Sequence, residues 1–184
     1  QRSALAGKGG APDTLHMTAT PIPRTLAITV YGGMDLSIIN ESPPGRTPIK
    51  TRRIPPSKTA DLYGYLHKQG ARGFQTYYVC PLVEESASRE LAAVTRHFTE
   101  LSQGVLAGLR TGLLHGRMNP VQKDEVMQQF HRWEIDVLFS TTVIEVGIDC
   151  PNATTMVIED AGNFGLTHLH QLRGRAGRGS EPPP

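Results

Sequence analysis

The sequence has few of the features that mark membrane proteins, disulfide-rich proteins or strongly charged proteins. It has no run of about 18 apolar residues, which a membrane-spanning helix would need. It has only two cysteines, Cys80 and Cys150, and each falls at the end of an apolar run. We therefore expect both cysteines to be reduced residues of the core in a cytoplasmic protein, because a single pair of cysteines does not make a disulfide framework. The net charge is only +2, so any binding to nucleic acid must depend on local basic patches.

The sequence also lacks a phosphate-binding loop of the common ATPase type. The pattern G-x-x-x-x-G-K-[ST] does not occur, and no acidic pair follows an apolar strand in the arrangement that holds magnesium in ATPases. The first residue is Gln1 rather than Met, and we expect the chain to be a piece of a longer protein. If that protein is an ATPase, this chain does not carry the parts that bind the phosphates and the magnesium.

Proline and glycine predict the domain organisation. Pro43, Pro44 and Gly45 interrupt the chain and Pro48 interrupts it again, which is typical of a linker. We therefore expect residues 1–44 to belong to one domain, residues 45–180 to form another, and the proline-rich residues 181–184 to be a loose tail.

Beyond the linker, apolar strand patterns alternate with amphipathic helix patterns. Several of the strands are apolar throughout, which is typical of a parallel sheet with helices on both faces. In such sheets ligands lie beyond the carboxyl ends of the strands, where we expect polar clusters at 115–117, 140–149 and 171–178. The expected strands are 49–54, 74–79, 111–114, 135–139 and 155–158.

The most distinctive cluster is basic and lies near the end of the chain, at residues 171–178. On a helix Gln171, Arg175 and Arg178 would share a face, because they are spaced i, i+4 and i+7. Two guanidinium groups and an amide on one face suit a triphosphate, since the planar fork of arginine matches phosphate oxygens. The alternative interpretation is a basic helix end that interacts with the helix dipole.

Two further clusters follow predicted strands. Residues 140–149 begin with three hydroxyl side chains, which can bind phosphate oxygens at a strand-to-helix turn. Gly147 would allow a tight turn there, and Asp149 could accept hydrogen bonds from a ribose. An ordinary strand-to-helix loop explains this cluster equally well. His115, Gly116 and Arg117 follow the strand at 111–114 and also suit a phosphate, although alone they are a weak signal.

No metal site is expected from the sequence. His168 and His170 are two residues apart, so on a helix they would point in different directions. The acidic residues at the strand ends 84–85 and 159–160 could bind a cation, but solvated loop acids are the favoured interpretation.

Taken together, these clusters resemble the second motor half of the superfamily 2 helicases. Residues 18–20 resemble motif III of that superfamily, residues 140–149 resemble motif V, and residues 171–178 match the Q-x-x-G-R-x-x-R pattern of motif VI. Within the superfamily, the chain is similar to the RecG family and, as the alternative, to the transcription-repair coupling translocases. The blocks that carry the similarity to RecG occur in order at 18–25, 80–86, 114–118, 152–161 and 164–175.

The resemblance implies an α/β, RecA-like C-terminal helicase domain in an ATP-dependent enzyme that remodels branched DNA in repair and recombination. ATP and Mg²⁺ would bind between this domain and the N-terminal motor half, which would supply the Mg²⁺ ligands, and a wedge domain would complete the protein. The alternative of another class is a nucleic-acid-binding module without catalysis. The implied site residues are Arg175, Arg178 and Gln171 for catalysis, Gly147 and Asp149 for the nucleotide, Thr142, His115, Gly116, Arg117 and Arg24 for DNA, and Thr18 and Thr20 for coupling.

Overall fold

The computed structural model describes residues 37, 49–81, 87–141, 150 and 152–176. The chain divides into two units, Gln1–Asn40 and Glu41–Pro184, and every described residue except Ser37 belongs to the second. The expected domain boundary at 44/45 and the expected tail lie outside the described residues. They therefore stay predictions.

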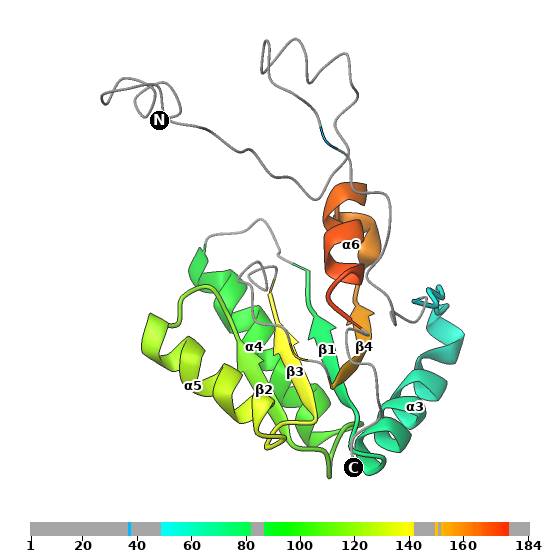
Figure 1. Cartoon of the computed structure of the whole chain (residues 1–184), viewed down its shortest axis with the longest axis horizontal. Coiled ribbons are helices and arrows are strands. Elements are labelled where there is room, and N and C mark those ends of the chain that lie inside the picture. The colour runs from blue at the N-terminus through cyan, green and yellow to red at the C-terminus, as the bar shows by residue number, and fades with distance from the viewer. Residues whose placement is uncertain (1–36, 38–48, 82–86, 142–149, 151, 177–184) are drawn as a thin grey trace. The chain divides into compact units, whose positions relative to one another are not determined.

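The described unit is built on a parallel sheet of four strands (Figure 1). The strands are β1 (Gln75–Val79), β2 (Thr111–Leu114), β3 (Val137–Ser140) and β4 (Ala153–Ile158), in the order β2-β3-β1-β4. β1 and β3 are buried along their whole length, which explains their continuous apolar sequences. The predicted parallel sheet is confirmed.

In the described part of the chain, four α-helices cover the two faces of this sheet. The helices α3 (Thr59–Ala71) and α4 (Ala87–Gln103) pack on one face, around Tyr78 and Phe139. The helices α5 (Pro120–His131) and α6 (Leu166–Arg173) pack on the other face, around Tyr77 and Leu138. The predicted cover of helices on both faces is therefore confirmed. Two short 3₁₀ helices, η1 (Pro56–Lys58) and η2 (Ala161–Asn163), complete the described elements.

The start of α5 is fixed by its own sequence. The Asn119 side chain accepts a hydrogen bond from the backbone N–H of Gln122 at 2.9 Å, and the Gln122 side chain accepts one from the backbone N–H of Asn119 at 3.1 Å. This capping box satisfies two backbone donors, and Pro120 occupies the first helical position, where no donor is needed. The sharp turn between β2 and α5 is thereby held in place.

The helices α3 and α5 end in the same way, with a residue in the left-handed conformation. In α3 this residue is Gly73 (φ 78°), and in α5 it is Trp133 (φ 64°). In both, the next residue donates a hydrogen bond back into the last turn, from Phe74 to Gln69 and from Glu134 to Gln129. Glycine adopts this conformation freely, whereas a tryptophan there is strained.

One predicted strand, at residues 49–54, is wrong. The structure has no regular element there, and residues 50–54 are exposed to solvent. An isolated extended segment gains no ladder hydrogen bonds, and Pro55 and Pro56 follow at once. The apolar residues Ile49 and Ile54 are therefore not enough to make a strand without a neighbouring strand to pair with.

Candidate functional site

The carboxyl ends of β2 and β3 lie side by side. Leu114 pairs with Ser140 in the parallel ladder, and the backbone N–H of Thr141 donates to the carbonyl of Leu114 at 3.3 Å. His115, which follows Leu114, is therefore next to the start of the hydroxyl-rich segment. The structure thus brings together two of the polar clusters that the sequence predicts at this edge, for the residues it describes.

Two polar atoms at this edge have no hydrogen-bond partner among the described residues. They are Nδ1 of His115 and Oγ of Ser140, and both are buried. A buried polar atom without a partner costs free energy, so such atoms often mark a place where a water, an ion or a ligand binds. Burial, and then the charges of Lys123 and Arg117, lower the pKa of His115 below its usual value. The imidazole is therefore neutral at pH 7.

Lys123 belongs to this site, although the sequence analysis did not single it out. Its ammonium group donates a hydrogen bond to the backbone carbonyl of Gly116 at 3.0 Å, directly beside the exposed Arg117. A cation in the first turn of a helix opposes the helix dipole, and this unfavourable placement is the signal that could have identified it. We call His115, Gly116, Arg117 and Lys123 the β2 exit cluster.

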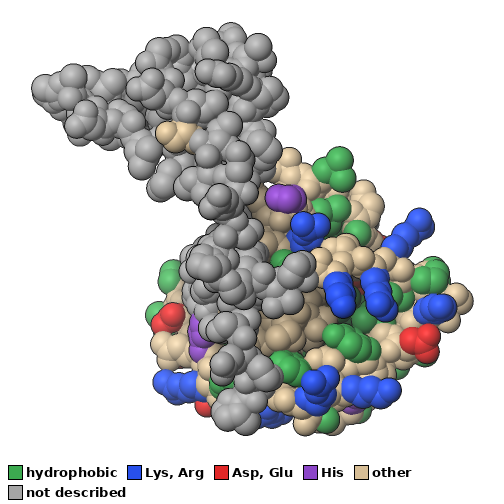
Figure 2. Space-filling model, turned by 45° about the vertical axis from the view of Figure 1, so that its right-hand side comes forward, with side chains coloured by type: hydrophobic (Ala, Val, Ile, Leu, Met, Phe, Trp, Pro, Cys, Tyr) green, Lys and Arg blue, Asp and Glu red, His purple; other side chains and the backbone are tan. Residues whose placement is uncertain are grey.

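The β2 exit cluster is suited to bind an anion. Two cations and the positive end of α5 lie together, and no acidic side chain occurs in the first turn of that helix. Figure 2 shows more Lys and Arg than Asp and Glu side chains on the described part of the visible surface. A polyanion can therefore approach the face seen in Figure 2 without strong repulsion.

The arginine-rich segment departs from its predicted geometry. Helix α6 ends at Arg173, so Arg175 lies in the following turn and does not share a helical face with Gln171. The last turn tightens, because Arg175 donates its backbone N–H to Leu172, three residues back, at 2.9 Å. Gly174 favours such an ending because glycine has a low helix propensity. The prediction of one helical face is therefore wrong for Arg175.

Gln171 is exposed and Arg175 is half-buried, between the buried Leu172 and Ala176. Leu172 packs in the core beneath α6, so the segment that carries both polar side chains is held on the domain. The other predicted site residues lie outside the described residues; they are Thr18, Thr20, Arg24, Thr142, Gly147, Asp149 and Arg178.

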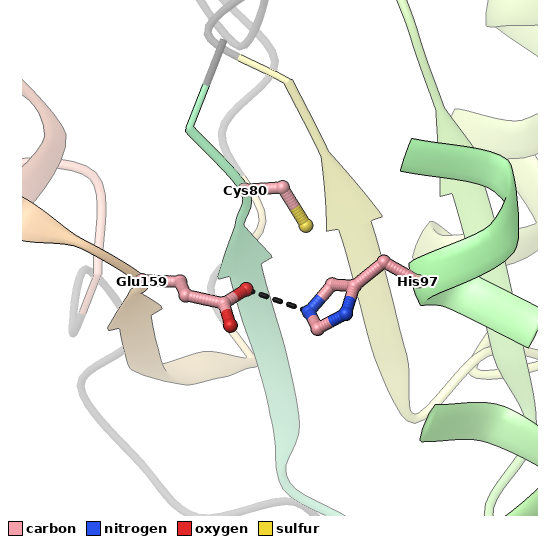
Figure 3. A group of neighbouring side chains, drawn as sticks. All are labelled: Cys80, His97 and Glu159. Atoms are coloured by element: carbon pink, nitrogen blue, oxygen red, sulfur yellow. Dashed lines mark hydrogen bonds and ion pairs between the residues drawn. The ribbon is translucent and has the colours of Figure 1, made fainter. Parts of the chain in front are cut away.

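A second group of side chains, which the sequence did not bring together, lies beyond β1 and β4 (Figure 3). Cys80 follows β1, Glu159 follows β4, and His97 lies on α4. His97 Nε2 and Glu159 Oε2 are 2.7 Å apart. Burial, and then the neighbouring Glu159 carboxylate, raise the pKa of the Cys80 thiol to about 12. The thiol is therefore protonated at pH 7 and is a poor nucleophile.

His168 and His170 do not form a comparable group. The His168 ring packs against Phe164 with ring centroids 5.5 Å apart, while His170 is exposed.

Among the helices that the structure describes, none is long and apolar enough to cross a membrane.

Comparison with known sequences identifies the family. The sequence pattern described as the helicase conserved C-terminal domain matches residues 57–180. The chain belongs to this helicase family. It is 49% identical, over 98% of its length, to the ATP-dependent DNA helicase RecG of Streptococcus pneumoniae serotype 4 and to that of Escherichia coli K12. The resemblance to RecG that the sequence motifs indicated is therefore confirmed.

A solved structure of RecG bound to a three-way DNA junction is similar in fold. It matches 94% of this chain with a TM-score of 0.75 and 44% sequence identity, and the match spans 22% of that protein. The chain likewise spans 27% of the length of each of the two RecG relatives named above. The RecA-like α/β fold of a helicase C-terminal domain is thus confirmed for this chain.

Proposed function

We propose that the chain is the second motor domain of an ATP-dependent DNA helicase of the RecG type, which remodels branched DNA such as stalled forks and Holliday junctions. The identity of 49% to RecG proteins over 98% of the chain carries this proposal. The similar RecG structure is bound to a three-way junction, which supports branched DNA as the substrate. Repair and recombination at the bacterial nucleoid, in the cytoplasm, fit such a substrate.

In this proposal the β2 exit cluster holds the phosphate backbone of DNA. Arg117 and Lys123 supply positive charge, the N-terminus of α5 adds a partial positive charge, and His115 lies beside both cations at the end of β2. Backbone contacts of this kind bind every sequence alike, which a translocating enzyme needs. Thr142 and Arg24 are further proposed contacts.

The arginine-rich segment would act on ATP. Arg175 and Arg178 are the proposed arginine fingers on the γ-phosphate, with Gln171 nearby and with Gly147 and Asp149 facing the nucleotide. The exposed Gln171 and the half-buried Arg175 lie on a segment held by the buried Leu172, which supports a fixed approach to a partner surface. The N-terminal motor half of the same protein would provide the phosphate loop and the Mg²⁺ ligands.

Closure of the two motor halves around ATP must be transmitted to DNA. Thr18 and Thr20 are the proposed coupling residues, because the segment that contains them resembles motif III. A wedge domain elsewhere in the protein would separate the strands at the branch point.

The finger assignment can be tested in the full-length protein with Arg178→Ala. We expect ATP turnover to fall by roughly 10³-fold or more, because a finger stabilises the charge that develops in the transition state. Nucleotide affinity should stay nearly unchanged, since the phosphate loop provides most of the ground-state binding. The measurements are steady-state phosphate release with branched DNA and nucleotide binding at equilibrium.

Arg173→Ala is the matched control, because Arg173 is an exposed arginine of the same segment that is not a proposed finger. It should retain turnover and regression of a model fork. Turnover that survives in Arg178→Ala would overturn the finger assignment. Displacement of a stalled RNA polymerase by the unaltered protein, without regression of the fork, would favour a transcription-repair coupling translocase instead.

A further inference from the structure

We propose that Cys80, His97 and Glu159 form a binding site for Zn²⁺, which ties α4 to the carboxyl edge of the sheet. The three side chains come from three different elements and point toward one another (Figure 3). They are the single group of three His, Cys, Asp or Glu in the described part of the chain whose ligand atoms lie within 4.8 Å of one another. This proposal does not depend on the proposed helicase activity.

The sheet fixes the backbone of two of the ligands. The backbone N–H of Cys80 donates to Ser140 of β3 at 2.8 Å, and the backbone N–H of Glu159 donates to Val79 of β1 at 3.0 Å. Three neighbouring strands therefore hold Cys80 and Glu159 side by side. The third ligand, His97, is on α4, which packs on the same face of the sheet through its neighbour Phe98.

The distances are close to those of a tetrahedral site. With metal–ligand bonds of about 2.0–2.3 Å, ligand atoms of a zinc site lie about 3.3–3.7 Å apart. In the structure all three pairs of ligand atoms are within 4.8 Å, and Nε2 of His97 and Oε2 of Glu159 are 2.7 Å apart. A zinc ion therefore needs the histidine and the carboxylate to separate by less than about 1 Å and the Cys80 sulfur to approach them by at most about 1.3 Å, which side-chain rotation supplies.

The donor set selects the metal. A sulfur, an imidazole nitrogen and a carboxylate oxygen are the three ligand types that Zn²⁺ uses in proteins. Mg²⁺ and Ca²⁺ prefer ligand sets made only of oxygen atoms, so they fit this group poorly.

The side chains of His97 and Glu159 are 35% and 29% exposed, so water can reach the fourth coordination position of the metal. Binding would release the Cys80 thiol proton to solvent and leave a thiolate on the metal. The proton between His97 Nε2 and the Glu159 carboxylate would also leave Nε2, so that this nitrogen can hold the metal.

The site can be tested by adding Co²⁺ and Zn²⁺ to the metal-free 184-residue chain. Tetrahedral Co²⁺ bound to a thiolate should give a charge-transfer band in the near ultraviolet at one equivalent of metal. Zn²⁺ should displace Co²⁺, abolish the band and raise the midpoint of thermal unfolding, because it binds the folded chain better than the unfolded one.

Cys80→Ser should abolish the charge-transfer band, and His97→Gln should weaken Co²⁺ binding strongly while keeping the fold, since His97 is partly exposed. Cys150→Ser is the matched control, because Cys150 is the other buried cysteine, and its thiol lies 3.5 Å from Gln75 Oε1. The band should remain in that variant. No band in the unaltered chain, a band that persists in Cys80→Ser, or full affinity in His97→Gln would overturn the proposal.

Discussion

At the scale of single residues, the charge of His115 is controlled by its neighbours. Burial is the largest cause of its lowered pKa, and the charges of Lys123 and Arg117 add to it. We expect Lys123→Gln to raise the pKa of His115 part of the way back toward its usual value of about 6.5, because one like charge is removed but burial remains. NMR titration of the His115 ring measures this directly.

Lys68→Gln is the matched control, since Lys68 lies on α3, which packs on the other face of the sheet. It should leave the pKa of His115 unchanged, and an equal shift in both variants would contradict the assignment.

Because the pKa of His115 is lower in the folded state than in the unfolded state, the contribution of His115 to stability is complete above about pH 6.5. That contribution is lost as the pH falls through 6.5 toward the lowered value.

Residues of the candidate sites were predictable where the sequence itself groups them. His115, Gly116 and Arg117 are consecutive and follow a recognisable strand, so their place at the sheet edge could be predicted. Lys123 contacts Gly116, seven positions earlier, across the turn between β2 and the capped start of α5. His97 and Glu159 are 62 positions apart, and no local pattern relates them before the helix packs on the sheet.

At the scale of elements, two glycines in helical surroundings should respond to alanine in opposite ways. A methyl group added at Gly64, in the exposed middle of α3, meets nothing within 4 Å. A methyl group at Gly104, after α4, would lie 2.6 Å from the backbone carbonyl oxygen of Glu100. Gly64→Ala should raise the free energy of unfolding by about 0.5–1 kcal/mol, because alanine has less backbone freedom to lose.

Gly104→Ala should instead lower the free energy of unfolding, by about 1 kcal/mol or more, because a backbone atom must move to relieve the contact. Urea unfolding followed by circular dichroism measures both variants, and each serves as the control of the other. Equal effects of the same sign would show that helix propensity alone decides the outcome at these two positions.

The elements that the sequence predicts well are those whose local signals agree with their packing. The strand at 111–114 is confirmed, because its apolar pattern agrees with its pairing to β3 in the sheet. The strand expected at 49–54 is wrong because strand pairing is not a local property. The early end of α6 depends on how its last turn tightens, which a spacing of i, i+4 does not reveal.

At the scale of the whole molecule, the 184 residues should bind DNA but not hydrolyse ATP. They contain no phosphate loop of the G-x-x-x-x-G-K-[ST] type, so the γ-phosphate would meet only the proposed fingers. We expect no phosphate release above background with or without branched DNA. DNA affinity should fall as salt rises, because the proposed contacts are to phosphates.

The measurement is phosphate release by the purified chain, compared with the same chain carrying Arg175→Ala and Arg178→Ala together. Turnover that disappears only in the double variant would contradict this expectation and would mean that one motor domain suffices for hydrolysis. Identical background rates in the two preparations agree with a domain that works only beside a partner.

The strained end of α5 also has a spectroscopic consequence. Trp133, in its left-handed conformation, is the single tryptophan of the sequence. Trp133 is half-buried and stands in the connection from α5, the helix that begins at the β2 exit cluster, to the strand β3. Light absorbed by tryptophan is therefore emitted from one known turn, so a change in the emission spectrum reports on this junction alone.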